Sequence, residues 1–125
     1  MKIFIFLSII CLSLPSWADM TVDLLPSEES PQLLGAPVTW SAQATGGSPG
    51  TLWYRFRARP QDGDFSVIRD FSPINTLVWT AAEREGDYAV EVTLRNTETG
   101  ETASAISGFE MSPLATDAAV VTTLN

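Results

Sequence analysis

The chain has 125 residues, and its 15 acidic residues outweigh seven Lys and Arg, for a net charge of −8 that would repel nucleic acid. It contains no His, and its single Cys and single Lys, Cys11 and Lys2, both lie within the first 18 residues. The rest of the chain therefore lacks the side chains for serine-triad or cysteine-dyad hydrolysis, for a His- or Cys-ligated zinc site, and for Schiff-base chemistry.

Residues 1–18 are predicted to be a signal peptide. Lys2 precedes an apolar stretch from Ile3 to Leu14, and Ser16-Trp17-Ala18 then places small residues at positions −3 and −1 of a cleavage site before Asp19. We therefore expect a secreted or periplasmic protein.

Two alternatives to cleavage before residue 19 are disfavoured. The apolar stretch is too short to cross a hydrocarbon core of about 30 Å, which argues against a membrane anchor. Lipid attachment at Cys11 is disfavoured because Ile10 stands where such sites have a small residue. After cleavage, roughly 107 residues form one domain without disulfides, so the apolar core must stabilise it alone.

Residues 19–37 are predicted to form an edge strand followed by a connection. Only Val22, Leu24 and Leu25 suggest a short strand. The segment also contains three prolines, which restrict a strand to the edge of a sheet.

Residues 38–111 are predicted to form the core of the domain, because apolar and polar residues alternate there with the period of two that is typical of half-buried strands. Gly108 suggests a β-bulge in the last of these strands. Residues 112–125 look like a linker. The strands are expected over residues 38–44, 52–58, 65–71, 77–79, 88–94 and 101–111.

Seven short strands, counting the edge strand, are separated by turns rich in Gly, Pro, Asn and Asp. This pattern predicts an all-β fold, a single antiparallel sandwich of two sheets. A small barrel is the alternative.

Residues 84–92 resemble the sixth strand of immunoglobulin-like domains, in which a corner Gly, a Tyr two residues later and a buried residue two beyond that recur. Here these positions are Gly86, Tyr88 and Val90. Val90 stands where antibody domains have Cys, so the resemblance is to disulfide-free bacterial members. It implies an immunoglobulin-like β-sandwich in which Tyr88 ties down its corner, and we expect Trp40 and Trp79 in the core.

A second resemblance concerns residues 50–57 together with Gly86-Asp87-Tyr88. This combination is similar to the leading module of exported aryl-sulfate sulfotransferase-like proteins, which carry a propeller afterwards. It implies an N-terminal fragment of a secreted enzyme. Those enzymes use a catalytic His in the propeller, and this chain has no His.

The outer face of the predicted strand 52–58 carries a run of four large side chains, namely Trp53, Arg55, Arg57 and Arg59. Alternate residues of a strand are about 6.7 Å apart, so this face could receive sulfate, carboxylate or sugar. The favoured interpretation is ordinary cross-strand pairing, because the sixth strand would offer Asp87, Glu91 and Arg95 beside it.

The sequence offers two further arrangements of carboxylates, neither of which forms a complete motif. Asp62-Gly63-Asp64 could ligate calcium, but it lacks the twelve-residue loop pattern and the following Glu. The sequence also singles out no pair of carboxylates for glycoside hydrolysis. We therefore predict no catalytic residue, metal or cofactor, and interpret the chain as an exported, non-catalytic binding module for protein or glycan contacts that is an accessory part of a larger secreted protein.

Overall fold

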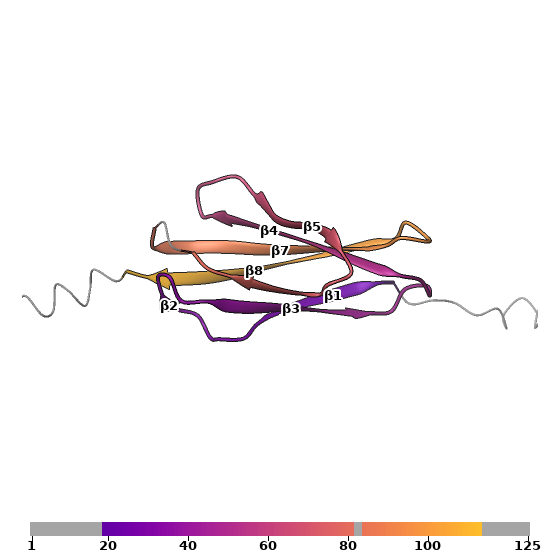
Figure 1. The fold of residues 1–125 in the computed structure, drawn as a ribbon, viewed down its shortest axis with the longest axis horizontal. Helices are drawn as coiled ribbons and strands as arrows, with labels where there is room; N and C mark the ends of the chain where they lie inside the picture. Colours follow the sequence, from indigo (N-terminus) through magenta and orange to yellow (C-terminus); the bar gives the residue numbers. More distant parts are fainter. Residues whose placement is uncertain (1–18, 82–83, 114–125) are drawn as a thin grey trace, which may run out of the picture.

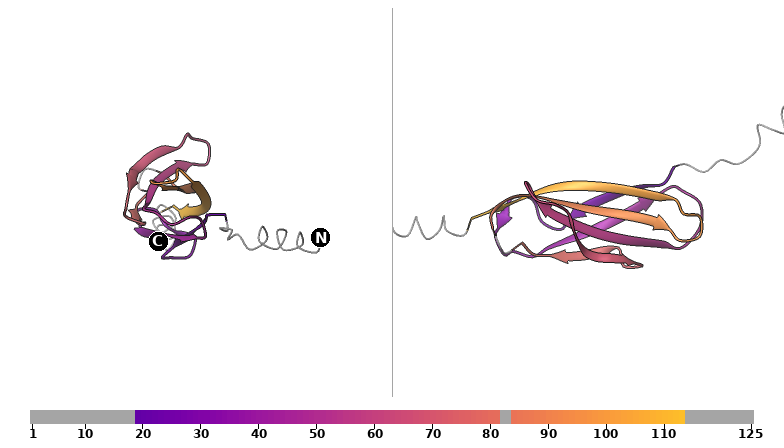
Figure 2. Two further views of the ribbon diagram at one scale, coloured as in Figure 1. Left: turned by 90° about the vertical axis from the view of Figure 1, so that its right-hand side faces the viewer. Right: turned by 90° about the horizontal axis from the view of Figure 1, so that it is seen from above.

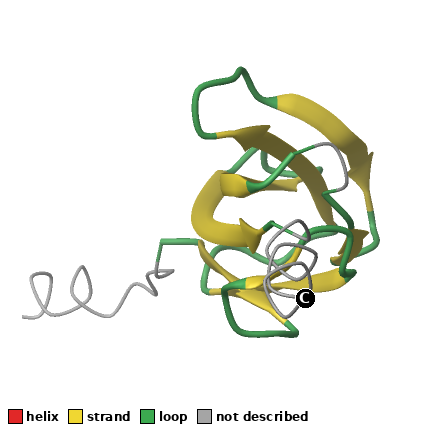
Figure 3. Ribbon diagram, turned by 90° about the vertical axis from the view of Figure 1, so that its left-hand side faces the viewer, coloured by secondary structure: helices red, strands yellow, loops and turns green. Residues whose placement is uncertain are grey.

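The computed structural model describes residues 19–81 and 84–113, which form a β-sandwich of two sheets (Figure 1). These residues contain strands and loops but no helix (Figure 3), and hence no helix that is long and apolar enough to span a membrane. The predicted all-β fold is confirmed. The predicted signal peptide and residues 114–125 of the predicted tail lie outside the described residues.

The two sheets contain three and five strands. The smaller sheet has the order β1-β3-β6, and the larger has the order β2-β8-β7-β4-β5. In chain order the strands are β1 (Thr21–Pro26), β2 (Gln32–Leu33), β3 (Val38–Thr45), β4 (Leu52–Pro60), β5 (Ser66–Ser72), β6 (Thr76–Trp79), β7 (Gly86–Asn96) and β8 (Thr102–Ser112).

Two details of the strand prediction are wrong. An eighth strand, β2, lies within the segment interpreted as a connection and pairs in parallel with β8, whereas every other pair is antiparallel. The expected bulge at Gly108 is absent, because this residue faces Ala89 within an unbroken register of β7 and β8. The irregular register lies instead between β4 and β5, at residues 54–57.

The first and last described residues lie at opposite ends of the sandwich (Figures 1 and 2). β1 begins at Thr21, opposite Thr45 at the end of β3. β8 ends at the other pole, where Met111 lies opposite Gly86. The chain therefore enters the sandwich at one pole and leaves it at the other.

The core between the sheets contains a cluster of aromatic rings. Trp40 and Trp79, which the sequence places in the core, are 0% and 5% exposed. Their ring centroids are 6.4 Å apart in an edge-to-face arrangement, and Phe109 contacts both rings in the same manner. Edge-to-face pairs add to the stability that apolar burial already provides. Val90, at the position where antibody domains have Cys, is fully buried.

Tyr88 fastens the corner at the start of β7. Its hydroxyl donates a hydrogen bond to the carbonyl oxygen of Arg84 at 2.6 Å, and its ring packs edge-to-face on Trp79 with centroids 5.4 Å apart. Gly86 has φ of +121°, and a Cβ there would meet nothing within 4 Å. The corner therefore needs glycine for its backbone conformation, not for space.

We expect Tyr88→Phe to lower the free energy of unfolding by about 0.5–1.5 kcal/mol, the usual net contribution of one hydrogen bond. The ring keeps its packing, and the exposed Arg84 carbonyl can be hydrated. Urea melts would measure the loss. The matched control is Tyr54→Phe, which removes the same hydroxyl from a tyrosine that makes no side-chain hydrogen bond to the described residues. Equal losses in the two variants would contradict the structural role of the corner.

Asn96 joins two loops at the opposite pole. Its side chain is fully buried, and Nδ2 donates to the carbonyl oxygen of Ser48 at 3.1 Å. Oδ1 accepts hydrogen bonds from the backbone amides of Glu98 at 2.9 Å and Thr99 at 3.1 Å. A Cβ at Gly50 would collide with the side-chain amide of Asn96, so glycine is required at this close approach.

Glu101 makes a second link between the same two loops. Its carboxylate accepts a hydrogen bond from the backbone amide of Ser48 at 3.1 Å, which lowers the pKa of Glu101. The two links fix the loop between β3 and β4 against the turn between β7 and β8.

Candidate functional site

The outer face of the five-stranded sheet carries the side chains that the sequence singled out on strand 52–58. On β4, Tyr54, Phe56 and Ala58 are buried between the sheets, so the alternate residues point away from the core. Those outward residues are Trp53, Arg55, Arg57 and Arg59, and β7 lies beside them.

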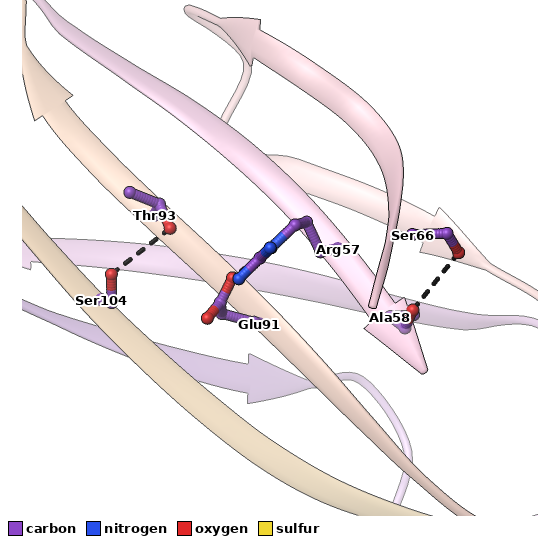
Figure 4. Close-up of polar contacts among 6 residues, drawn as sticks. All are labelled: Arg57, Ala58, Ser66, Glu91, Thr93 and Ser104. Carbon is purple, nitrogen blue, oxygen red and sulfur yellow. Dashed lines mark hydrogen bonds and ion pairs between the residues drawn. The ribbon is translucent and has the colours of Figure 1, made fainter. Parts of the chain in front are cut away.

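Arg57 is the arginine that forms the predicted ion pair. It lies opposite Glu91 on β7, and its Nε donates to Oε1 at 2.6 Å (Figure 4). The two side chains are 30% and 11% exposed. The hydrogen bond with Glu91 is the main cause of the raised pKa of Arg57. This pair therefore matches the favoured interpretation of the face.

The other predicted ion pairs are wrong for the described residues, in which Arg57–Glu91 is the single salt bridge. Arg55 lies opposite Thr93, and Arg59 lies opposite Ala89, so neither faces a carboxylate across the sheet. Asp87 lies beyond the end of β4, where its carbonyl oxygen accepts from the backbone amide of Gln61. The register of β4 and β7 therefore leaves two of the three arginines on β4 without an acidic partner.

Two phenylalanines next to β4 hold the guanidinium groups instead. The Phe71 cluster contains Arg55 and Arg95, whose Cζ atoms lie 5.1 and 4.3 Å from the centroid of the Phe71 ring. The Phe65 cluster contains Arg57 and Arg59, each 4.8 Å from the centroid of the Phe65 ring. Cation–π attraction holds each guanidinium on a ring without using any of its N–H groups, of which only Nε of Arg57 donates to a carboxylate among the described residues.

The clusters leave hydrogen-bond donors without a protein acceptor. Nε of Arg55 and Nε of Arg59 are both buried and have no partner among the described residues. Every guanidinium carries five N–H donors, and Arg57 alone on this face donates one to a carboxylate. The terminal N–H groups of Arg55 and Arg59 are not buried and also have no partner among the described residues, so an external anion can accept hydrogen bonds from them.

Sequence reasoning identified the arginines but missed Phe65 and Phe71. The signal was present, because the two aromatic residues stand at the first and last positions of the predicted strand 65–71 and lie an even number of residues apart. An even spacing places both side chains on one face of a regular strand.

The turn at Asp62-Gly63-Asp64 shows no arrangement for calcium. Both carboxylates are on exposed residues, and within residues 19–81 and 84–113 no group of three acidic or other metal-ligating side chains comes together.

A pocket of about 500 Å³ opens where the edges of the two sheets diverge. Trp79, Tyr88 and Ile68 supply part of its apolar lining, and Arg84 contributes to its polar lining. It lies beside the tyrosine corner and is separate from the row of Trp53 and Arg55 on the outer face.

Comparisons with known proteins give no family assignment for this arrangement. No protein-family model matches the chain, and no curated protein shows significant similarity to it. Any function must therefore be argued from the fold and from the outer face itself.

Proposed function

We propose that the chain is an exported, non-catalytic immunoglobulin-like module that makes protein or glycan contacts through the outer face of its five-stranded sheet. The observation that carries this proposal is the pair of arginine clusters, whose guanidinium groups are oriented by phenylalanine rings and largely lack acidic partners.

The strand order supports the immunoglobulin-like part of the proposal. In such sandwiches the first, second and fifth strands of the constant-type order share a sheet, as β1, β3 and β6 do here. The third, sixth and seventh strands make up the other sheet, which matches the neighbours β4, β7 and β8. The hydrogen bond from Tyr88 to Arg84 is the interaction expected of a tyrosine corner.

The chemistry of the side chains supports a binding role over catalysis. The region after residue 18 contains neither His nor Cys. A guanidinium stays protonated at any accessible pH, so the arginines on this face are suited to holding anions, not to transferring protons.

We expect the purified protein to bind at least one member of a panel of acidic peptides and of acidic and neutral oligosaccharides with Kd below about 1 mM. Arg55→Gln should weaken that binding about tenfold or more, because a charge-assisted hydrogen bond is lost. Surface plasmon resonance would measure both affinities.

The matched control is Arg84→Gln, which changes the net charge equally but lies at the corner with Tyr88, near the end of β4 that is farther from Trp53. It should retain the affinity of the unaltered protein. Absence of any binder, or equal weakening by Arg55→Gln and Arg84→Gln, would overturn the contact function. Export is tested separately, by intact mass of the protein outside the cytoplasm, which should begin at Asp19.

A further inference from the structure

The outer face is not uniform along the strands. The registers of β4, β7 and β8 place residues in cross-strand rows, and the first two rows contain no carboxylate. We call these two rows the Trp53 patch, which consists of Trp53, Arg95 and Thr102 in the first row and Arg55, Thr93 and Ser104 in the second.

Along these registers, acidic side chains enter from the third row onward, and beyond the first row the carboxylate of Glu98 accepts from the backbone amide and the hydroxyl of Thr51. The third row contains Glu91, whose carboxylate forms the ion pair with Arg57. In the row at the far end, Asp87 lies opposite Glu110. The Trp53 patch therefore combines two positive charges with no negative one, on a protein whose net charge is −8. An anion is drawn to this end of the face and repelled from the other end.

Both arginines of the patch belong to the Phe71 cluster. Their Cζ atoms lie 5.1 and 4.3 Å from the same ring centroid, so both positive charges lie against one ring. Neither forms a salt bridge within the described residues, and Nε of Arg55 is buried without a partner. A carboxylate or sulfate that bridges the two guanidinium groups would neutralise this charge and accept from the unused donors.

The other side chains of the patch suit a sugar. Trp53 is 38% exposed, and an indole provides a flat apolar surface with one polar edge. Hydroxyl groups follow on β7 and β8, where Ser104 Oγ lies 3.3 Å from Thr93 Oγ1 (Figure 4). Hydroxyls can both donate to and accept from the hydroxyls of a sugar.

From these rows we infer that the Trp53 patch binds an acidic glycan, with a sugar ring on the indole and its carboxylate or sulfate on Arg55 and Arg95. This inference rests on the proposed contact function and names its ligand class. Duplex DNA carries one charge per about 1.7 Å of its axis and would be repelled by the acidic body, whereas an acidic glycan carries its charges farther apart. An acidic sugar also carries hydroxyl groups that can pair with those of Thr93 and Ser104 beside the arginines.

The test is calorimetric titration of the full protein at low salt with five probes. These are oligogalacturonate, a sulfated galactan oligomer, a neutral galactan oligomer, poly-glutamate and single-stranded oligothymidine. We expect at least one acidic oligosaccharide to bind with Kd below about 1 mM and at least tenfold more tightly than the neutral one. Added salt should weaken the binding, because screening shortens the reach of the charges.

Three variants test whether the acidic oligosaccharide binds at the Trp53 patch. Arg95→Gln and Trp53→Ala should each weaken the acidic oligosaccharide about tenfold or more, whereas Arg84→Gln, with the same change of charge as Arg95→Gln, should leave its affinity unchanged. Thermal melts of each variant show that it remains folded.

The possible outcomes distinguish a failure of the acidic-glycan inference from a failure of the proposed contact function. Binding of poly-glutamate or oligothymidine without any glycan, lost in Arg95→Gln, would overturn the glycan assignment and leave the contact function standing. Equal affinity for acidic and neutral oligomers, or affinity unchanged in Arg95→Gln and Trp53→Ala, would also overturn the assignment. Absence of binding to every probe and every panel member would overturn both.

Discussion

Trp40→Ala is expected to lower the free energy of unfolding by about 3–5 kcal/mol, the range found when a large aromatic side chain is removed from a core. Trp40 is fully buried, and its ring contacts that of Trp79 in its own sheet and that of Phe109 across the sandwich. A typical domain has a free energy of unfolding of only about 5–15 kcal/mol. The variant should therefore be mostly unfolded or only marginally stable. Urea denaturation followed by circular dichroism measures the loss.

Trp53→Ala is the matched control, because it removes the same side chain from the outer face. Trp53 is 38% exposed and lies outside the buried core, so we expect a loss of about 0.5 kcal/mol. Similar losses in the two variants would mean that the aromatic cluster does not dominate the stability of the core.

Asn96→Ala is expected to cost about 2–3 kcal/mol, because three hydrogen bonds between its buried side chain and partly buried backbone groups are lost. The amides of Glu98 and Thr99 and the carbonyl of Ser48 all depend on this one side chain. Hydrogen exchange adds a local readout, since the amides of residues 98 and 99 should exchange faster in the variant.

Asn75→Ala provides the comparison for that loss. Asn75 is exposed and donates one side-chain hydrogen bond, to the carbonyl of Ala42 at 2.9 Å. Its removal should cost about 0.5–1 kcal/mol. If Asn96→Ala cost no more than this, or left the exchange of residues 98 and 99 unchanged, Asn96 would not be the link between the two loops.

The sequence allowed the layers of the fold to be predicted, because the period of two in strands such as β4 and β7 determines which face is buried. It did not allow the partners across the sheet to be predicted. A shift of register by two residues keeps every side chain on its face but changes the residue opposite it. For this reason the arginines were placed correctly on the outer face, whereas the ion pair expected from Asp87 was wrong.

Two other features, strand β2 and the burial of Asn96, could not be predicted from the sequence. β2 has only two residues, which is too short for any periodic pattern, and its partner β8 is far away in the chain. Asn96 reads as an ordinary turn residue, and its burial results from two loops that meet only in the folded domain. In both cases the determining contacts are long-range and leave no local periodic pattern.

The first and last described residues lie at opposite poles of the sandwich. This separation decides how copies of the domain could be joined in an array. If copies of the domain were joined in tandem, the link would leave one copy at the pole where β8 ends and enter the next at the pole where β1 begins, so the copies would follow one another along the strand direction. The row of arginines on β4 runs along that same direction, on the outer face of the larger sheet. Each repeat in such an array would present its own Trp53 patch laterally, and several patches could engage one long glycan chain with the gain in avidity that tethered sites provide.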